Sequence, residues 1–258
     1  ITWNPYDVSN NALRGAGALR KPGGLGWSMN VSSDYRKKIS FGINFFKFWA
    51  EDNAVSYNNA GISLNLVPIN SLSISLSANY DENRRNQDQF VRNITYNNAT
   101  RTIVAGVKQK TIRFTGRLSY NLTPDLTIQY YGQPYLTRPT YQQFAYVVNP
   151  LADKYVNRFL KYSSSQISES NGTYLIDENW DGITDYSFGK PDFNFVQFRS
   201  NLVIRWEYRP GSELFLVWSE GNTPDAFAEL DKPVFNSLFN NAFSGGNARN
   251  IFLVKFTY

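Results

Sequence analysis

The segment Ser71-Leu72-Ser73-Ile74-Ser75-Leu76-Ser77-Ala78-Asn79-Tyr80 alternates polar and apolar residues without interruption. Successive side chains of a β-strand point to opposite faces, so this segment predicts a strand with one polar and one apolar face. A soluble β-sandwich produces the same alternation, and one strand therefore does not distinguish a soluble sheet from a membrane-spanning one.

The same alternation recurs along the chain and predicts nine long strands. In one of them, Ile39, Phe41 and Ile43 alternate with polar residues. The fourth strand looks interrupted by the polar stretch Asp81–Gln89. Strands of about nine or more residues suit a tilted membrane crossing better than a globular sheet. The expected strands span residues 24–35, 39–50, 56–67, 71–96, 101–122, 125–137, 193–209, 212–220 and 248–258.

Short and long connections alternate between these strands. The short ones are rich in turn residues, and they lie at 36–38, 70–71, 123–125 and 209–211. The longer ones lie at 51–55, 97–101, 138–192 and 221–248. Outer-membrane barrels have short periplasmic turns and long outer loops. The pattern therefore predicts an all-β fold, an antiparallel transmembrane β-barrel, with residues 138–192 as a long extracellular loop.

Tyrosines mark the ends of strands beside the short turns. They lie in phase with the apolar side of their strands, which is where an aromatic girdle meets the membrane interface. A row of tyrosines capping the rim of a soluble sheet is the alternative. The girdle residues are Tyr35, Tyr120, Tyr208 and Tyr258.

The number of strands bears on how the barrel closes. Nine is odd, whereas single-chain bacterial barrels have an even number of strands. Either Ile1–Val8 begins a further strand, or residues 1–258 form the C-terminal part of a larger barrel. We favour the second interpretation.

The composition excludes several classes of protein. The 258 residues include no Cys and no His, so no disulfide, Ser-His pair, Cys-His pair or imidazole metal site can form. We therefore do not expect an enzyme, although a carboxylate pair acting on glycan stays open. No apolar run approaches the roughly 20 residues of a membrane-spanning helix. The net charge of +5 is spread along the chain, so we expect no nucleic-acid partner.

One segment resembles a calcium-binding loop. Hard oxygen ligands at alternate positions, with Gly182 at the bend, suit Ca²⁺. Phe188 stands where the closing Glu would be expected, and a solvated turn rich in Asp, Asn and Gly is an equally good interpretation. The candidate ligands are Asp177, Asn179, Asp181, Ile183 through its carbonyl, and Asp185.

Five charged residues share the polar phase of their strands, so they would point into the lumen of a barrel. They could select anions or line a pore, but an ion-pair network that fills the interior is the more common arrangement. Buried arginines need partners, and the single acidic residue among them does not supply enough. These residues are Arg113, Arg117, Arg199, Arg205 and Glu207.

Several segments resemble a known family: Arg113–Asn121, Thr123–Pro134, Asp177–Asp185 and Asn194–Ser219, the last with the block Trp-Glu-Tyr-Arg-Pro-Gly-Ser at 206–212. They resemble the C-terminal region of a Bacteroidota outer-membrane family of unknown function. Its members join an N-terminal module, similar to family-9 carbohydrate-binding domains, to a C-terminal barrel. The resemblance covers most of residues 10–258 and implies an outer-membrane location in a Gram-negative bacterium, but no catalytic residues.

We therefore expect an integral outer-membrane protein that acts as a channel, or as the anchor or translocation component of a glycan-related surface system. A membrane-embedded glycan-active enzyme and a soluble β-sandwich adhesin are the alternatives. Expected partners are outer-membrane lipid and lipopolysaccharide, the barrel-insertion machinery, and surface proteins or glycans. The alternating end of the chain, Phe252 to Tyr258, resembles the signal which that machinery recognises. The substrate, the state of the lumen and the oligomeric state stay open.

Overall fold

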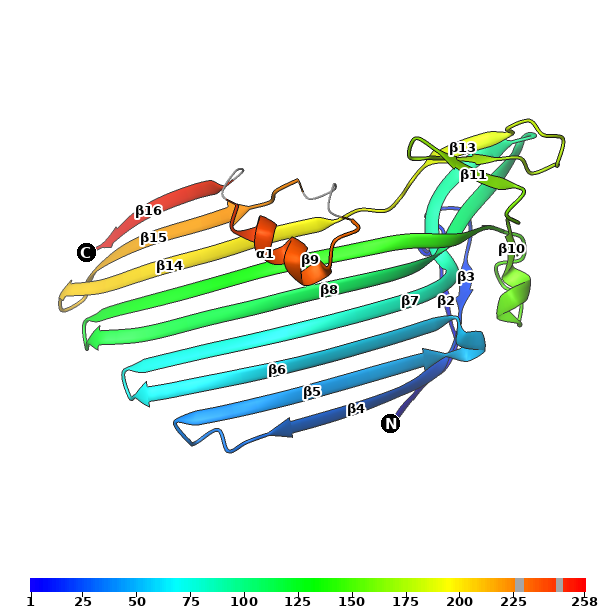
Figure 1. Cartoon of the computed structure of the whole chain (residues 1–258). Coiled ribbons are helices and arrows are strands. Elements are labelled where there is room, and N and C mark those ends of the chain that lie inside the picture. Colours follow the sequence, from blue (N-terminus) through cyan, green and yellow to red (C-terminus); the bar gives the residue numbers. More distant parts are fainter. Residues whose placement is uncertain (226–229, 245–247) are drawn as a thin grey trace.

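The computed structural model describes residues 1–225, 230–244 and 248–258, apart from the side chains of residues 86 and 87. Within these residues the chain forms an eleven-stranded antiparallel sheet with two smaller sheets (Figure 1). The main sheet runs in the order β1 (Thr2–Asn4), β4 (Gly24–Ser32), β5 (Ile39–Ala50), β6 (Val55–Ile69), β7 (Leu72–Tyr96), β8 (Ala99–Thr123), β9 (Leu126–Val147), β14 (Phe195–Arg209), β15 (Ser212–Asn222) and β16 (Arg249–Thr257), and β10 (Phe159–Lys161) pairs with β9.

The prediction of an all-β antiparallel fold is confirmed, but a closed barrel is not seen. Within the described residues the sheet begins at β1 and ends at β16, and no pairing joins these two edges. Thr2–Asn4 does pair with β4, as a strand of only three residues. No helix in the described part of the chain is long and apolar enough to cross a membrane.

Several strand ends differ from the predicted ones, and β4 ends at Ser32 rather than at residue 35. β7 is continuous, and a shift of register between Arg85 and Gln89 replaces the expected interruption. β9 reaches Val147, so the long connection begins at residue 148 rather than 138. The expected long connection at 97–101 is a tight turn, in which Asn97 and Asn98 have φ of 49° and 58°. Two positive φ values favour asparagine in such hairpins.

Two ends of the sheet can therefore be distinguished. The turn end carries the short turns near residues 36, 70, 124 and 210, and the opposite loop end carries the remaining connections. At the loop end, a cap sheet of β11 (Ile167–Ser170), β12 (Thr173–Ile176) and β13 (Tyr186–Gly189) lies beside the extended tips of β7 and β8 (Figure 1).

The N-terminal residues 5–23 form a second loop-end feature, which we call the strap. It contains the hairpin of β2 (Asp7–Ser9) and β3 (Leu19–Lys21). Its Leu13 and Leu19 are fully buried against Val104, Ala145 and residues near the short helices η1 (Glu51–Asn53) and η2 (Tyr155–Arg158). The strap thereby joins the region of β5 to that of β9.

A helix that the sequence analysis missed covers part of the sheet. In α1 (Val234–Ala242), Leu238 and Ala242 pack in a core with Ile112, Leu136, Val196 and Phe198 of β8, β9 and β14 (Figure 1). The four-residue spacing of Val234, Leu238 and Ala242 is the helical signal in this part of the sequence.

Candidate functional site

The two faces of the main sheet differ in chemistry. The strand register aligns apolar residues into rows that cross the sheet. One row takes a residue from each of eight neighbouring strands: Ile39, Leu66, Ile74, Leu118, Tyr130, Leu202, Trp218 and Phe252. We call this side the apolar face. Many of its side chains are uncovered, with exposed fractions of 63% for Ile39 and 75% for Phe252.

The opposite side, the polar face, is joined by hydrogen bonds and ring contacts between neighbouring strands. Ser75 Oγ donates to Asn65 Oδ1 at 2.7 Å, and Ser219 Oγ donates to Asn201 Oδ1 at 3.2 Å. Between these pairs, the Arg117 guanidinium lies 5.4 Å from the centre of the Tyr131 ring. A surface of this kind can hydrate a passage or bind a polar solute.

The register places the predicted lumen charges on this polar face, but their partners differ from expectation. Arg205 forms an ion pair with Glu213 of β15, whereas Glu207 accepts the Gly211 N–H at 2.9 Å and closes the turn. Arg113 and Arg199 share the phase of Arg117 in their strands. Because the described sheet is open, their position in a lumen stays a prediction.

A cavity of about 930 Å³ lies where the strap meets the polar face. It is lined by aromatic side chains of the sheet, by amides such as Asn11 and Asn83, and by a charged group at its edge. There, the buried Asp88 Oδ2 accepts bonds from Lys21 Nζ and Arg85 Nη1, both at 3.0 Å. No motif in the sequence identified this triad, because the bulge in β7 and the strap bring it together.

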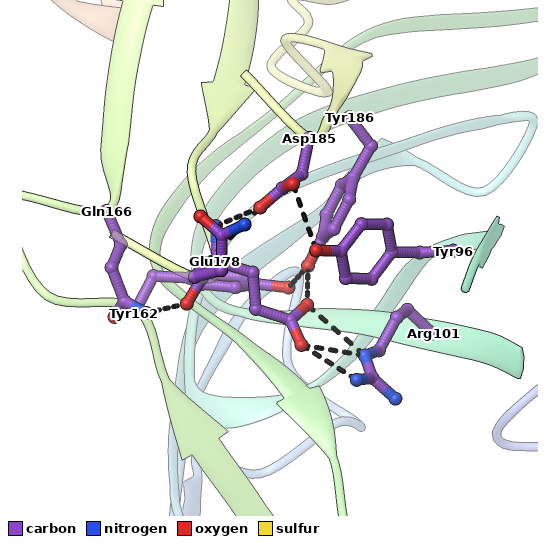
Figure 2. A network of polar contacts seen from close by, with 8 residues as sticks. Tyr96, Arg101, Tyr162, Gln166, Glu178, Asp185 and Tyr186 are labelled. Carbon is purple, nitrogen blue, oxygen red and sulfur yellow. Dashed lines mark hydrogen bonds and ion pairs between the residues drawn. The ribbon is translucent and has the colours of Figure 1, made fainter. Parts of the chain in front are cut away.

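A second polar cluster attaches the cap sheet to the β-sheet tips (Figure 2). Glu178 accepts bonds from Arg101 Nε at 3.0 Å and Nη2 at 2.8 Å, and it also accepts the Tyr186 hydroxyl. The Tyr96 hydroxyl donates to Asp185 Oδ1 at 2.9 Å. The cluster lies over a core that contains Ile103, Phe144 and Phe188 among others.

Burial and hydrogen bonds shift the pKa values of three residues of this cluster. Desolvation raises the pKa of Tyr186, and the hydrogen bonds to Glu178 and Tyr162 raise it further. Desolvation also raises the pKa of Tyr162. The bond to Glu178 raises the pKa of Arg101. Each of these shifts favours the protonated form, so Tyr186, Tyr162 and Arg101 hold their protons at neutral pH.

The oxygens of the predicted calcium loop bind the loop's own backbone. Asp177 accepts N–H bonds from Trp180 at 2.7 Å and Gly182 at 2.8 Å, and Asp185 Oδ2 accepts that of Glu178 at 2.7 Å. Asp181 Oδ1 accepts the N–H of Ile183, and Asn179 donates to Asp181 Oδ2. In the described part of the chain, no three acidic side chains are grouped to hold a metal. Calcium binding stays a prediction.

Limited proteolysis tests the calcium prediction. If Ca²⁺ orders the loop, residues 160–190 of the purified protein resist cleavage with Ca²⁺ and are cut faster with chelator. Extracellular calcium sites have dissociation constants of about 10⁻⁴ to 10⁻³ M, and the Ca²⁺ concentration of the experiment must exceed this range. Asp181→Ala should then be cut rapidly in both conditions. Equal cleavage in all four samples leaves the hydrogen-bonded turn as the explanation.

The predicted girdle tyrosines lie at the turn end. Tyr35 and Tyr258 are fully or largely exposed, and Tyr208 contacts Trp206 with a ring-centre distance of 6.1 Å. Tyr120 stands opposite Leu72 and Ile128 on neighbouring strands. β4 ends at Ser32, so Tyr35 lies in the turn and not at the end of that strand, and Tyr258 follows the last residue of β16. The girdle and its contact with a membrane stay predictions.

The chain was compared with curated proteins, solved structures and models of protein families. No curated protein matches the chain. Among solved structures, the siderophore receptor PiuA from Acinetobacter baumannii is similar at 13% identity and a TM-score of 0.38, over 92% of this chain and 44% of the receptor. The chain thus spans less than half of that receptor. The expected Bacteroidota distribution and carbohydrate-binding module stay predictions. A family model described as a domain of unknown function, DUF5916, matches residues 14–258, and the chain belongs to this family.

Proposed function

We propose that the main sheet forms part of the wall of an outer-membrane β-barrel in a Gram-negative bacterium, with the apolar face toward lipid. The observation that carries this proposal is the row of apolar side chains across eight strands. Soluble proteins rarely expose contiguous apolar surfaces larger than a few hundred Å². A lipid environment removes the cost of leaving such a face uncovered.

The height of the apolar face supports the same proposal. On β8 the apolar positions run from Ile112 to Tyr120, eight residues apart, which is about 26 Å along a strand. With a strand tilt of about 40°, this gives roughly 20 Å of height, close to the ~25 Å apolar band of outer-membrane barrels. Beyond Ile112, the same face carries the charged residues Lys110 and Lys108.

The open edges of the sheet require a partner in this proposal. Unpaired backbone groups cost several kcal/mol each in lipid, so further strands must pair with β16 and with the uncovered part of β4. They can belong to the same polypeptide or to a second copy. The polar face then lines the interior, and the strap and its cavity narrow the loop end.

We further propose that this wall serves as a channel or as the anchor of a surface system, without a catalytic role. Because the strap narrows one mouth, the anchor or a gated passage is favoured over a wide pore. Conductance of the full-length protein in planar bilayers distinguishes a channel from an anchor. A steady current or discrete channel openings support the channel, and the absence of both from protein shown to be inserted supports the anchor.

Site-directed spin labelling tests the orientation of the two faces. The sequence has no native cysteine, so Leu118→Cys and Arg117→Cys are clean single-label variants on opposite faces of β8. In proteoliposomes we expect the label at 118 to be accessible to oxygen and that at 117 to a water-soluble nickel chelate. Equal water accessibility at both positions would contradict a membrane-spanning sheet.

A further inference from the structure

The apolar face is hollowed between β5 and β8. Ala78 and Gly116 are small residues among large neighbours there, and they leave a groove of about 590 Å³ along Phe41, Ile62 and Leu76. A second hollow of about 500 Å³ shares Ile43, Ile62 and Phe114 with it and continues toward the loop end. We call the two together the apolar groove.

Helix α1 borders this groove. Phe235 lines the second hollow, and Phe114 packs between Phe235 and Phe239 at ring-centre distances of 6.5 and 5.4 Å. Phe235 and Phe239 are still about half exposed. The helix is held in place from behind, because Asn194 Nδ2 donates to Ser237 Oγ at 2.9 Å. The groove therefore has a fixed apolar side wall.

A basic cluster lies at the loop end of the groove. In register just beyond Ile112 and Tyr80, one cross-strand row holds Lys47, Asn58, Glu82 and Lys110, and the next holds Trp49, Ser56, Arg84 and Lys108. Four cations thus accompany one carboxylate. Glu82 is bonded to Arg84 at 3.1 Å and Lys108 at 3.5 Å, yet the Arg84 and Lys108 side chains remain 58% and 37% exposed.

We propose that this surface binds an anionic membrane lipid, with an acyl chain in the apolar groove and the phosphate on the basic cluster. The proposal rests on the membrane location proposed above. An uncovered apolar groove suits an acyl chain, and the excess of three positive charges at its end suits a phosphate. Trp49 is 44% exposed, and its ring centre lies 4.9 Å from Lys47 Nζ. An aromatic side chain of this kind suits the same interface.

Native mass spectrometry of the full-length protein in a neutral detergent tests this proposal. Dioleoyl phosphatidic acid and dioleoyl phosphatidylcholine are supplied at equal concentration. We expect preferential retention of phosphatidic acid. Lys110→Gln and Arg84→Gln should each lower its retention about fivefold, since a cation near a lipid surface contributes about that factor. Retention of phosphatidylcholine should not change.

Two further variants complete the test. Lys161→Gln, a matched charge removal at an exposed position of β10, should leave the preference unchanged. Ala78→Phe, which fills the groove, should lower retention of both lipids. If the wild type retains both lipids equally, the lipid site is wrong but the membrane-spanning sheet stands. If it also remains dispersed without detergent and the spin labels at 117 and 118 are equally water-accessible, the membrane proposal itself is wrong.

Discussion

Replacing Arg158 with methionine is expected to detach the strap from the loop end of the sheet. Arg158 is 1% exposed, and its guanidinium donates to the carbonyl oxygens of Ala152 at 2.8 Å, Asp153 at 2.9 Å and Arg20 at 2.8 Å. Methionine fills similar space but leaves these three acceptors unpaired. Each buried acceptor left unpaired costs about 1–3 kcal/mol, so we expect a loss of several kcal/mol.

The measurement is protease sensitivity of residues 5–23 together with the thermal unfolding midpoint of the purified protein. Lys154→Met is the matched control, because Lys154 is an exposed cation in the same segment. Arg158→Lys should be nearly as harmful as methionine, since a single ammonium cannot reach three carbonyls in the guanidinium's planar arrangement. A wild-type midpoint and an uncut strap in Arg158→Met would show that the apolar contacts of the strap and its Lys21–Asp88 pair hold it without Arg158.

The sequence predicted the strands well, because alternation reports directly on a sheet with two different faces. The expected strand at 39–50 matches β5, and that at 212–220 falls two residues short of β15. Strand ends at the loop side were less accurate. β9 continues ten residues past the expected end at 137, through a segment where buried residues such as Phe144 and Ala145 belong to loop-end cores and no longer alternate simply.

The clusters at the loop end could not be predicted in the same way. Asp88 meets Lys21 across 67 positions, and Arg101 meets Glu178 across 77. Such pairs depend on how the strap and the cap sheet fold back, which no local pattern encodes. Arg205 illustrates the same point on a small scale. The sequence puts Arg205 and Glu207 on the same polar side of one strand, but the register of β15 brings Glu213 to Arg205 instead.

Deletion of residues 251–258 is expected to abolish assembly in the membrane. β16 pairs with β15 along nine residues, from Arg249 opposite Gly221 to Thr257 opposite Glu213. Its loss uncovers the backbone of β15, and under the proposed function that edge would meet lipid or lose the strand that closes the barrel. With several unpaired groups at several kcal/mol each, the loss exceeds the 5–15 kcal/mol that stabilises an ordinary domain. Heat-modifiable gel migration of the outer-membrane fraction measures how much of the protein has assembled.

Two point variants separate the pairing of β16 from the terminal aromatic signal. Phe256→Ala and Tyr258→Ala retain the backbone that bonds to β15, so they should insert normally if the open edge causes the defect. If they fail as completely as the deletion, recognition of the aromatic terminus by the insertion machinery is the cause, because these side chains are exposed and stabilise no core. Normal insertion of the deletion itself would refute both explanations, since an unpaired β15 and a missing terminal signal would then both be tolerated.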